Sequence, residues 1–287
     1  MSDKVILVTG ATGKQGQAVV QHTLARGFKV RALTRSPETP SALALKAQGV
    51  EIAQGDMENV ASLRFAMTGV YGVFCTQNYW EKGVGLEGEI RQGRNVAQAA
   101  AEVQVTHFVH SSVAGCDRAP WLKHFAGKWE IEKIVDSLGL QRTFLRSVFF
   151  MENFLDPQTG LLVMPVLAGA LKPTQPLHMI AVDDIGWFAA EAFANPQIYL
   201  GRSPEIAGDC LTVAQMKQVY RKITGKAALG FKAPLWLFRL VNGEVAKQFI
   251  WNNQHGWHFD VEALRRIHPQ LIDFETFLRR NRAKIKA

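Results

Sequence analysis

The feature that most constrains the fold is the glycine-rich segment TGATGKQG, which follows directly on the apolar run KVILV near the start of the chain. Gly10 permits a tight turn, Gly13 lets the backbone approach a pyrophosphate with no Cβ in the way, and Gly16 lets helix and strand pack closely. A strand pattern precedes the loop and a helical pattern follows it. The helix N-terminus then presents free N–H groups to an anion. The segment therefore predicts a dinucleotide-binding βα turn.

Other residues of the same loop are expected to contact the cofactor. Lys14 adds a positive charge inside the loop, and Thr12 and Gln15 complete the candidate set. A glycine triple alone is often only a turn, so the prediction depends on the strand and helix around it.

Strand and helix patterns alternate along the first half of the chain. A parallel, doubly wound sheet of the Rossmann type is the fold that such alternation specifies. The expected strands are 4–10, 29–35, 50–56, 71–77, 106–112 and 141–150, and the expected helices are 14–27, 41–49, 60–69, 87–103 and 121–138.

The alternation loosens after Phe150, where several prolines occur in quick succession. We therefore predict an α/β protein with a dinucleotide-binding domain over residues 1–154 and a second, smaller C-terminal lobe over 155–287. The segment 178–208 is expected to return to the first domain. Asp183 or Asp184 is predicted to cap the helix ahead of Ile185, and Thr212 the helix from Val213.

The residue at the end of the second strand bears on the choice of cofactor. An acid there binds the ribose 2′-hydroxyl of NAD, but the strand here ends ALTRSP, which places Arg35 at that position. A guanidinium can bind a phosphate with two hydrogen bonds, so NADP(H) is preferred over NAD(H). The alternative is that Arg35 is an ordinary surface residue.

The third strand ends in QGDMEN, which makes Asp56 and Met57 candidates for the adenine end of the cofactor. The Asp56 carboxylate is suited to accept from the adenine amino group. It is equally suited to cap the next helix, and both interpretations stay open.

Composition excludes several other classes of protein. Three scattered cysteines indicate neither a disulfide framework nor a zinc site, and no metal is expected. The chain starts at once with a strand pattern and has no apolar run of membrane-spanning length, so a cytoplasmic protein is expected. Of the net charge of +8, seven basic against two acidic residues from Arg265 onward supply +5. We interpret them as one solvated helix face, which makes a nucleic-acid partner the weaker alternative.

The segments TGATGKQG, LTRSP, QGD, TQNYW, HFAGK and FFMENF, in this order, resemble the NmrA-like family of atypical short-chain dehydrogenases/reductases. The resemblance also covers DDIG and the closing HPQLIDFETFL. It implies a two-lobed molecule with the dinucleotide between the lobes. Members of the family include NADP(H)-sensing regulators that bind other proteins and reductases that act on quinones or similar carbonyls. A shared fold does not by itself show which of these functions the protein has.

The superfamily's YxxxK motif pairs a proton-donating tyrosine with a lysine that holds the nicotinamide ribose, and the matching segment here is HFAGK. His124 and Lys128 lie four residues apart on one helical face, so Lys128 can keep its role. His124 is either a proton donor or a packing residue. Ser111 and Ser112 end the fifth strand, where such enzymes place a substrate-binding serine. Ser112 is our candidate, although strand alternation points the two side chains to opposite faces.

Further cofactor contacts follow from the resemblance. Thr76, Asn78 and Tyr79 come after the fourth strand and are placed beside the nicotinamide ribose. Phe150 and Asn153 come after the sixth strand, and the alternative for this patch is ordinary core packing. His107 and His110 resemble a metal pair, but their spacing on a strand puts them on opposite faces.

Two functions therefore stay open. The first is a redox sensor, in which NADP(H) binding changes how a partner protein is recognised, and the absent tyrosine favours it. The second is an NADPH-dependent oxidoreductase that transfers a hydride to a quinone or similar carbonyl, whose product takes its protons from water.

Overall fold

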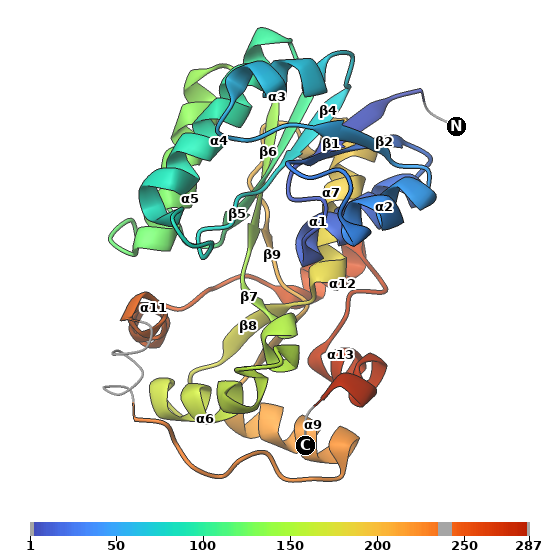
Figure 1. Cartoon of the computed structure of the whole chain (residues 1–287). Helices are drawn as coiled ribbons and strands as arrows, with labels where there is room; N and C mark the ends of the chain where they lie inside the picture. The colour runs from blue at the N-terminus through green and yellow to red at the C-terminus, as the bar shows by residue number, and fades with distance from the viewer. Residues whose placement is uncertain (1–2, 235–242, 286–287) are drawn as a thin grey trace. The chain divides into compact units, whose positions relative to one another are not determined.

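The computed structural model describes residues 3–234 and 243–285, which form two compact units. The first unit comprises Met1–Arg146 and Ile185–Pro204, and the second comprises Ser147–Asp184 and Glu205–Ala287. Figure 1 labels the elements of both units.

The first unit is built on a parallel sheet with the strand order β3-β2-β1-β4-β5-β6. The predicted α/β, Rossmann-type fold is confirmed. Its strands are β1 (Val5–Val8), β2 (Lys29–Thr34), β3 (Glu51–Gln54), β4 (Gly72–Cys75), β5 (His107–Val113) and β6 (Arg142–Ser147).

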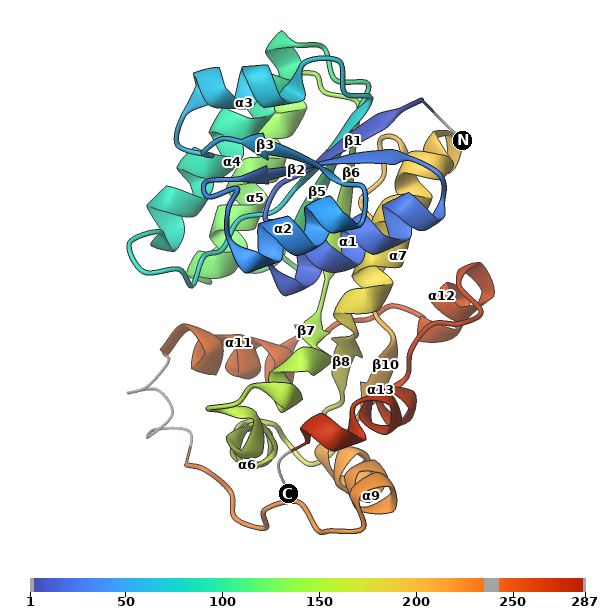
Figure 2. The ribbon, with the colours of Figure 1, turned by 45° about the vertical axis from the view of Figure 1, so that its right-hand side comes forward.

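Helices cover both faces of this sheet (Figures 1 and 2). One face carries α1 (Lys14–Ala25), α2 (Pro40–Ala47) and α7 (Val182–Ala194), and the other carries α3 (Val60–Met67), α4 (Gly85–Glu102) and α5 (Lys123–Ser137). The short helix α8 (Pro196–Tyr199) follows α7. Because both faces are covered, the two central strands β1 (VILV) and β4 (GVFC) contain no polar side chain.

The core of this unit lies between the sheet and helices α3, α4 and α5. Strand residues Leu7, Val73 and Phe108 pack there against Val96 of α4 and Ile131 of α5, and all are fully buried. Each such side chain contributes on the order of 2 kcal/mol of hydrophobic stabilisation. This core fixes the carboxyl ends of β1 and β4 beside each other, which positions the candidate site.

The second unit contains a small sheet in which β8 (Leu177–Ile180) lies between β10 (Asp209–Leu211) and β7 (Phe149–Phe150). β10 pairs with β8 antiparallel and β7 pairs with it parallel. The expected strand 141–150 is thus split into β6 and β7. The other elements are η1 (Met151–Leu155), α6 (Gly160–Ala170), β9 (Glu205–Ile206), α9 (Val213–Thr224), α11 (Gly243–Gln254), α12 (Val261–Ile267), α13 (Phe274–Arg280) and η2 (Arg282–Lys284).

Of the two predicted helix starts, the structure confirms that of α9 and moves that of α7. Thr212 caps α9 as expected, and Gln215 reciprocates its hydrogen bond in a capping box. Neither Asp183 nor Asp184 precedes α7 as its N-cap, because the helix begins at Val182 and both residues lie in its first turn. The Val182 N–H donates instead to the Glu152 carboxylate at 3.0 Å. The carboxylate of Glu152, thirty residues earlier, therefore accepts from the first helical N–H, which a neighbouring aspartate was expected to do.

The segment that rejoins the first unit is Ile185–Pro204, which is shorter than the expected 178–208 because β8 pairs within the small sheet. The C-terminal basic residues do not share one helix face. Within the described residues they are divided among α12, α13 and η2, where several pair with acids such as Glu262 and Glu275.

Candidate cofactor site

The loop between β1 and α1 adopts a turn that only glycines permit. Gly10 has a φ of +60°, and its carbonyl accepts from the Gly13 N–H at 2.9 Å. A Cβ on Gly16 would overlap the Gly10 carbonyl oxygen and the Ala11 Cα. Gly16 thus allows the helix to approach the loop backbone, which is the role expected from its position.

The first turn of α1 is open to an anion. The helix begins at Lys14 after Gly13, which has no side chain to cap the first N–H groups, and no acid lies in the first turn. Lys14 is exposed, and Thr12 is half-buried with its carbonyl accepting from Gln17. The N-terminus therefore combines free donors with a positive side chain.

Thr76 connects this loop to the end of β4. The Thr76 N–H donates to the Thr9 hydroxyl at 2.8 Å, and the Thr76 hydroxyl donates to the Gln15 Oε1 at 2.9 Å. The Gln15 Nε2 is buried and has no partner among the described residues. Since β1 and β4 flank the point where the strand order reverses, this is where doubly wound folds bind ligands.

Arg35 follows β2 and is exposed, but it has a partner. Its Nη2 donates to the Glu81 Oε1 at 2.9 Å. This hydrogen bond and the charge of Glu81, with a smaller contribution from Asp56, raise the pKa of Arg35 above its usual value. Arg35 is therefore a permanent cation whose present counter-ion is a carboxylate.

An open hollow lies beside Arg35 and is lined by Arg35, Gln54, Gly55, Asp56, Asn59 and Ser62. Asp56 is not the helix cap, because α3 is capped by Asn59, whose side chain accepts from the Ser62 N–H at 3.0 Å. The Asp56 carboxylate accepts from the Glu58 N–H at 2.9 Å instead. Met57 packs against the core and directs its carbonyl to Asn95.

An aromatic cluster surrounds His124, in the first turn of α5. The His124 ring centroid lies 6.0 Å from that of Tyr79, 5.8 Å from that of Trp80 and 4.7 Å from that of Phe125. The indole of Trp80 is 56% exposed although it is apolar. Asn78 is exposed and accepts from the Trp80 N–H at 3.2 Å. His124 thus packs among rings that reach solvent.

Lys128 lies one turn further along α5 and forms a buried ion pair. Its Nζ lies 3.0 Å from the Glu89 Oε1 and donates to the Gln77 Oε1 at 3.4 Å. The Glu89 side chain is 1% exposed and that of Lys128 is 14% exposed. The ammonium is therefore held by α4 and by the segment that follows β4, and the Lys128 side chain as a whole is only partly buried.

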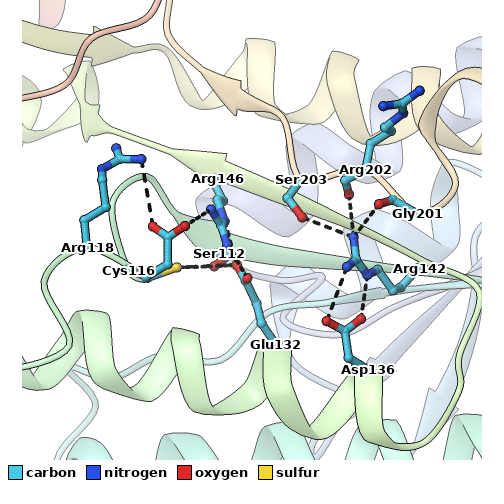
Figure 3. A network of polar contacts seen from close by, with 11 residues as sticks. Ser112, Cys116, Arg118, Glu132, Asp136, Arg142, Arg146, Gly201, Arg202 and Ser203 are labelled. Atoms are coloured by element: carbon cyan, nitrogen blue, oxygen red, sulfur yellow. Dashed lines mark hydrogen bonds and ion pairs between the residues drawn. The ribbon is translucent and has the colours of Figure 1, made fainter.

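Ser112 belongs to a different buried network, drawn in Figure 3. Its hydroxyl donates to the Glu132 Oε1 at 2.6 Å. The same carboxylate accepts from the Arg146 Nε at 3.0 Å and Nη2 at 2.7 Å, and the Arg146 Nη1 donates to Asp117 at 2.8 Å. Ser111 is also buried.

Cys116 completes the network, with its Sγ 3.5 Å from the Glu132 Oε1. Burial, followed by the charge of Glu132, raises the pKa of Cys116 to about 12. The thiol is therefore protonated and inert at neutral pH.

The remaining candidates lie elsewhere. Phe150 and Asn153 belong to the second unit, where Phe150 is half-buried and Asn153 exposed. His107 bonds to the Thr143 hydroxyl and His110 to the Cys75 carbonyl.

Among the described residues, no group of three or more His, Cys, Asp and Glu side chains is arranged to hold a metal ion. None of the described helices has the length and hydropathy of a membrane span.

Three acids beside the candidate residues were not predicted. Glu81 and Glu89 pair with the candidate cations Arg35 and Lys128. Glu132 accepts from the candidate Ser112 and pairs with Arg146. A signal existed for Glu89, which shares the buried face of α4 with Gly88, Gln92, Gly93 and Val96. An acid within an apolar stripe indicates a buried charge that needs a partner. Glu132 shows the same pattern beside Ile131 and Val135 on α5.

The sequence model of the NmrA-like family matches residues 2–275. The chain belongs to the NmrA-like family. An NmrA-like family domain-containing oxidoreductase of Aspergillus japonicus is 30% identical over 252 residues, covering 78% of this chain and 74% of that protein. An NmrA-like family domain-containing protein of Dictyostelium discoideum is 26% identical, covering 98% of this chain and 99% of the other.

Solved structures share the fold of this NmrA-like chain. The triphenylmethane reductase of Citrobacter sp., complexed with NADP(H), has a TM-score of 0.80 at 20% identity and covers 96% of this chain and 99% of its own. An NADPH-dependent quinone oxidoreductase of Escherichia coli, complexed with NADPH, has a TM-score of 0.80 at 24% identity, with coverage of 95% and 98%. NmrA, a negative transcriptional regulator, in complex with NADP has a TM-score of 0.76 at 21% identity, with coverage of 97% and 95%.

Proposed function

We propose that the protein binds NADP(H) at the loop between β1 and α1 and acts as a sensor of the NADPH/NADP state. The loop carries the proposal. Gly10 and Gly16 permit its close turn, the α1 N-terminus is uncapped, and the Gln15 Nε2 is a buried donor without a partner among the described residues. An orphaned buried donor is costly unless something accepts from it, and a pyrophosphate oxygen is suited to do so.

The other candidates fit the remaining parts of the same cofactor. Arg35 would bind the 2′-phosphate, and the hollow bordered by Asp56 would receive the adenine. Lys128 would bind the nicotinamide ribose, which agrees with its position and its partial exposure. When bound, the dinucleotide supplies a two-electron redox couple.

Glu81 modifies the preference for NADP(H). A 2′-phosphate would compete with the Glu81 carboxylate for the hydrogen-bond donors and the charge of the Arg35 guanidinium. Arg35 therefore favours NADP(H) over NAD(H), while Glu81 reduces the gain. The preference for NADP(H) over NAD(H) therefore equals the attraction of Arg35 for the 2′-phosphate less the cost of displacing Glu81 from Arg35.

Two observations favour a sensor over an enzyme. His124 stands where the superfamily has its proton-donating tyrosine, and its ring packs against Tyr79, Trp80 and Phe125. The Ser112 hydroxyl is committed to Glu132. The His124 ring is thus packed among aromatic rings and the Ser112 hydroxyl is turned to a buried carboxylate, whereas the glycine loop leads into an uncapped helix N-terminus. NmrA, which shares the fold, is itself named a negative transcriptional regulator.

The exposed aromatic cluster supports a second candidate, an NADPH-dependent oxidoreductase. Trp80 offers a flat apolar surface to solvent next to His124, which lies one turn before Lys128 on α5. A planar quinone or similar carbonyl acceptor could stack there beside the proposed nicotinamide. The relatives named oxidoreductase or quinone oxidoreductase agree with this alternative.

One experiment separates the two candidates. The purified chain is mixed with NADPH and a panel of quinones and aldehydes, and the loss of NADPH absorbance is followed. The sensor proposal expects tight NADPH binding, no acceptor-dependent turnover, and a protein partner recovered by pull-down in only one cofactor state. Turnover that Lys128→Ala abolishes would overturn the pure sensor and establish the oxidoreductase. Trp80→Ala, which removes the stacking surface, would then raise KM for the acceptor more than it lowers kcat.

A further inference from the structure

A chain of polar contacts in the first unit starts at Lys128 and runs into the interior. The Lys128 Nζ contacts Glu89 and Gln77, and the Gln77 Nε2 donates to the Cys75 Sγ at 2.8 Å. The Cys75 carbonyl in turn lies 3.1 Å from the His110 Nδ1. These residues come from β4, β5, α4 and α5, so the cluster belongs to the rigid core of the unit.

The two titratable side chains at the inner part of this cluster, Cys75 and His110, are electrically neutral. Burial raises the pKa of the Cys75 thiol to about 12. Burial, followed by the positive charge of Lys128, lowers the pKa of His110 well below its ordinary value. Among the described members of the cluster, the charged side chains are therefore Lys128 and Glu89, and their charges cancel.

The Glu89 carboxylate also packs against Gly127, the residue before Lys128 on α5. Its Oε2 is buried against Gly127, where a Cβ would overlap that oxygen, and it has no hydrogen-bond partner among the described residues. Gly127 thus leaves room for a carboxylate on the helix that carries Lys128. A buried carboxylate with one unsatisfied oxygen is expensive, which argues for a purpose beyond packing.

We propose that Glu89 sets the relative affinity of the site for the oxidised and the reduced cofactor. The proposal rests on the proposed function, in which Lys128 binds the nicotinamide ribose. The nicotinamide ring of NADP⁺ carries a positive charge that NADPH lacks. An uncompensated Lys128 would repel only the oxidised ring, and Glu89 removes this discrimination by cancelling the lysine charge. Glu89 is a positioning and charge-balancing residue, and contact with the cofactor is made by Lys128.

This role fits a sensor. A site that binds NADPH much more tightly than NADP⁺ is filled by NADPH over most cellular ratios, and it then reports concentration instead of redox state. Comparable affinities make the bound form follow the ratio of the two cofactors. The ion pair is the feature that brings the two affinities together.

The test compares the ratio Kd(NADP⁺)/Kd(NADPH) in the wild type, Glu89→Gln, Lys128→Gln and the double variant, by calorimetry at one ionic strength. Glu89→Gln leaves the lysine uncompensated and should raise the ratio about tenfold, the scale of a unit charge acting over several ångströms in a partly buried site. Lys128→Gln leaves the carboxylate and should lower the ratio. The double variant should return to within about twofold of the wild type, because it is again neutral.

The ligand 2′,5′-ADP is the control, because it carries the phosphates and lacks the nicotinamide. Its affinity should be equal in all four proteins, which shows that the loop is intact. A ratio unchanged in Glu89→Gln with normal 2′,5′-ADP binding would overturn the inference and leave the proposed function standing. A wild type that binds neither NADPH nor 2′,5′-ADP would overturn both. If Glu89→Gln fails to fold, Lys128→Gln decides: a lowered ratio supports the proposal, and an unchanged one refutes it.

Discussion

The hydroxyl of Thr76 donates a hydrogen bond to the Oε1 of Gln15 at 2.9 Å, which ties the end of β4 to the glycine loop after β1. The hydrogen bond fixes the orientation of the Gln15 amide, so that its Nε2 is the group left without a partner among the described residues. A donor presented in this way beside an uncapped helix N-terminus is prepared for an anionic acceptor.

The first prediction concerns this amide. Gln15→Glu replaces the donor with an acceptor and adds a negative charge beside the proposed pyrophosphate, and it should weaken NADPH binding by about tenfold to hundredfold. Thr76→Val should weaken binding by a few-fold, because the amide loses its orientation, whereas Thr76→Ser keeps the hydroxyl and serves as the control. Fluorescence titration with NADPH measures all three. Unaltered affinity in Gln15→Glu would exclude this residue from the site.

The second prediction concerns the competition at Arg35. Glu81→Gln removes the carboxylate that now engages the guanidinium and should tighten NADPH binding by a few-fold without affecting NADH. Arg35→Gln should weaken NADPH binding by about tenfold and also leave NADH unaffected. The ratio of the two dissociation constants is the measurement. If both variants keep the wild-type ratio, Arg35 is an ordinary surface residue.

The third prediction concerns stability. Glu132→Gln removes the carboxylate that accepts two hydrogen bonds from the buried Arg146 and leaves Asp117 as the acidic partner of that guanidinium, and it should lower the free energy of unfolding by about 3 kcal/mol. The control is Glu130→Gln on the same helix, whose ion pair with Lys133 is exposed and should contribute no more than about 0.5 kcal/mol. Urea denaturation compares them. Equal midpoints for the two variants would show that the buried network is dispensable.

The fourth prediction concerns acid sensitivity. Burial lowers the pKa of His107 from 6.5 to about 4, so the unfolded chain binds a proton at this residue before the folded chain does. The free energy of unfolding should therefore fall as the pH drops from about 6.5 toward 4, by up to about 1.4 kcal/mol per pH unit for this histidine. His110 acts in the same direction.

Urea midpoints at pH 7 and pH 5 test the pH prediction. His107→Gln retains a group able to bond to Thr143 and removes the titration, so its midpoint should change less between the two pH values than that of the wild type. An identical change in both proteins would show that His107 does not contribute to the acid sensitivity.

The fold was largely predictable because its signals are local. The apolar run that ends at Gly10 indicated the first strand, the alternation of strand and helix patterns indicated the parallel sheet, and Thr212 marked the start of α9. The small sheet of the second unit was not foreseen, because β7 and β10 are too short to show a periodicity. The start of α7 was misplaced because its first N–H is satisfied by Glu152, thirty residues earlier in the chain.

The site was predictable only in part, for a similar reason. The glycine positions and Arg35 follow from the βα rhythm, whereas His124 and Lys128 were predicted only from the resemblance of HFAGK to the family's motif. Their partners Glu81 and Glu89 are far away in sequence and meet them only through tertiary packing. Asp56 had two equally good interpretations until Asn59 proved to be the cap of α3.

Binding of NADPH at the loop between β1 and α1 is tested most directly by calorimetric titration. The wild type should bind one NADPH more tightly than NADH. Gly13→Ala should still fold, because Gly13 has an ordinary extended backbone and a shift of a few tenths of an ångström relieves the 3.3 Å contact of its Cβ with the Gly10 carbonyl oxygen. It should nevertheless lose most of the affinity, because the Cβ would obstruct the pyrophosphate. A wild type that binds neither cofactor, or a Gly13→Ala variant that binds NADPH as well as the wild type, would contradict the account.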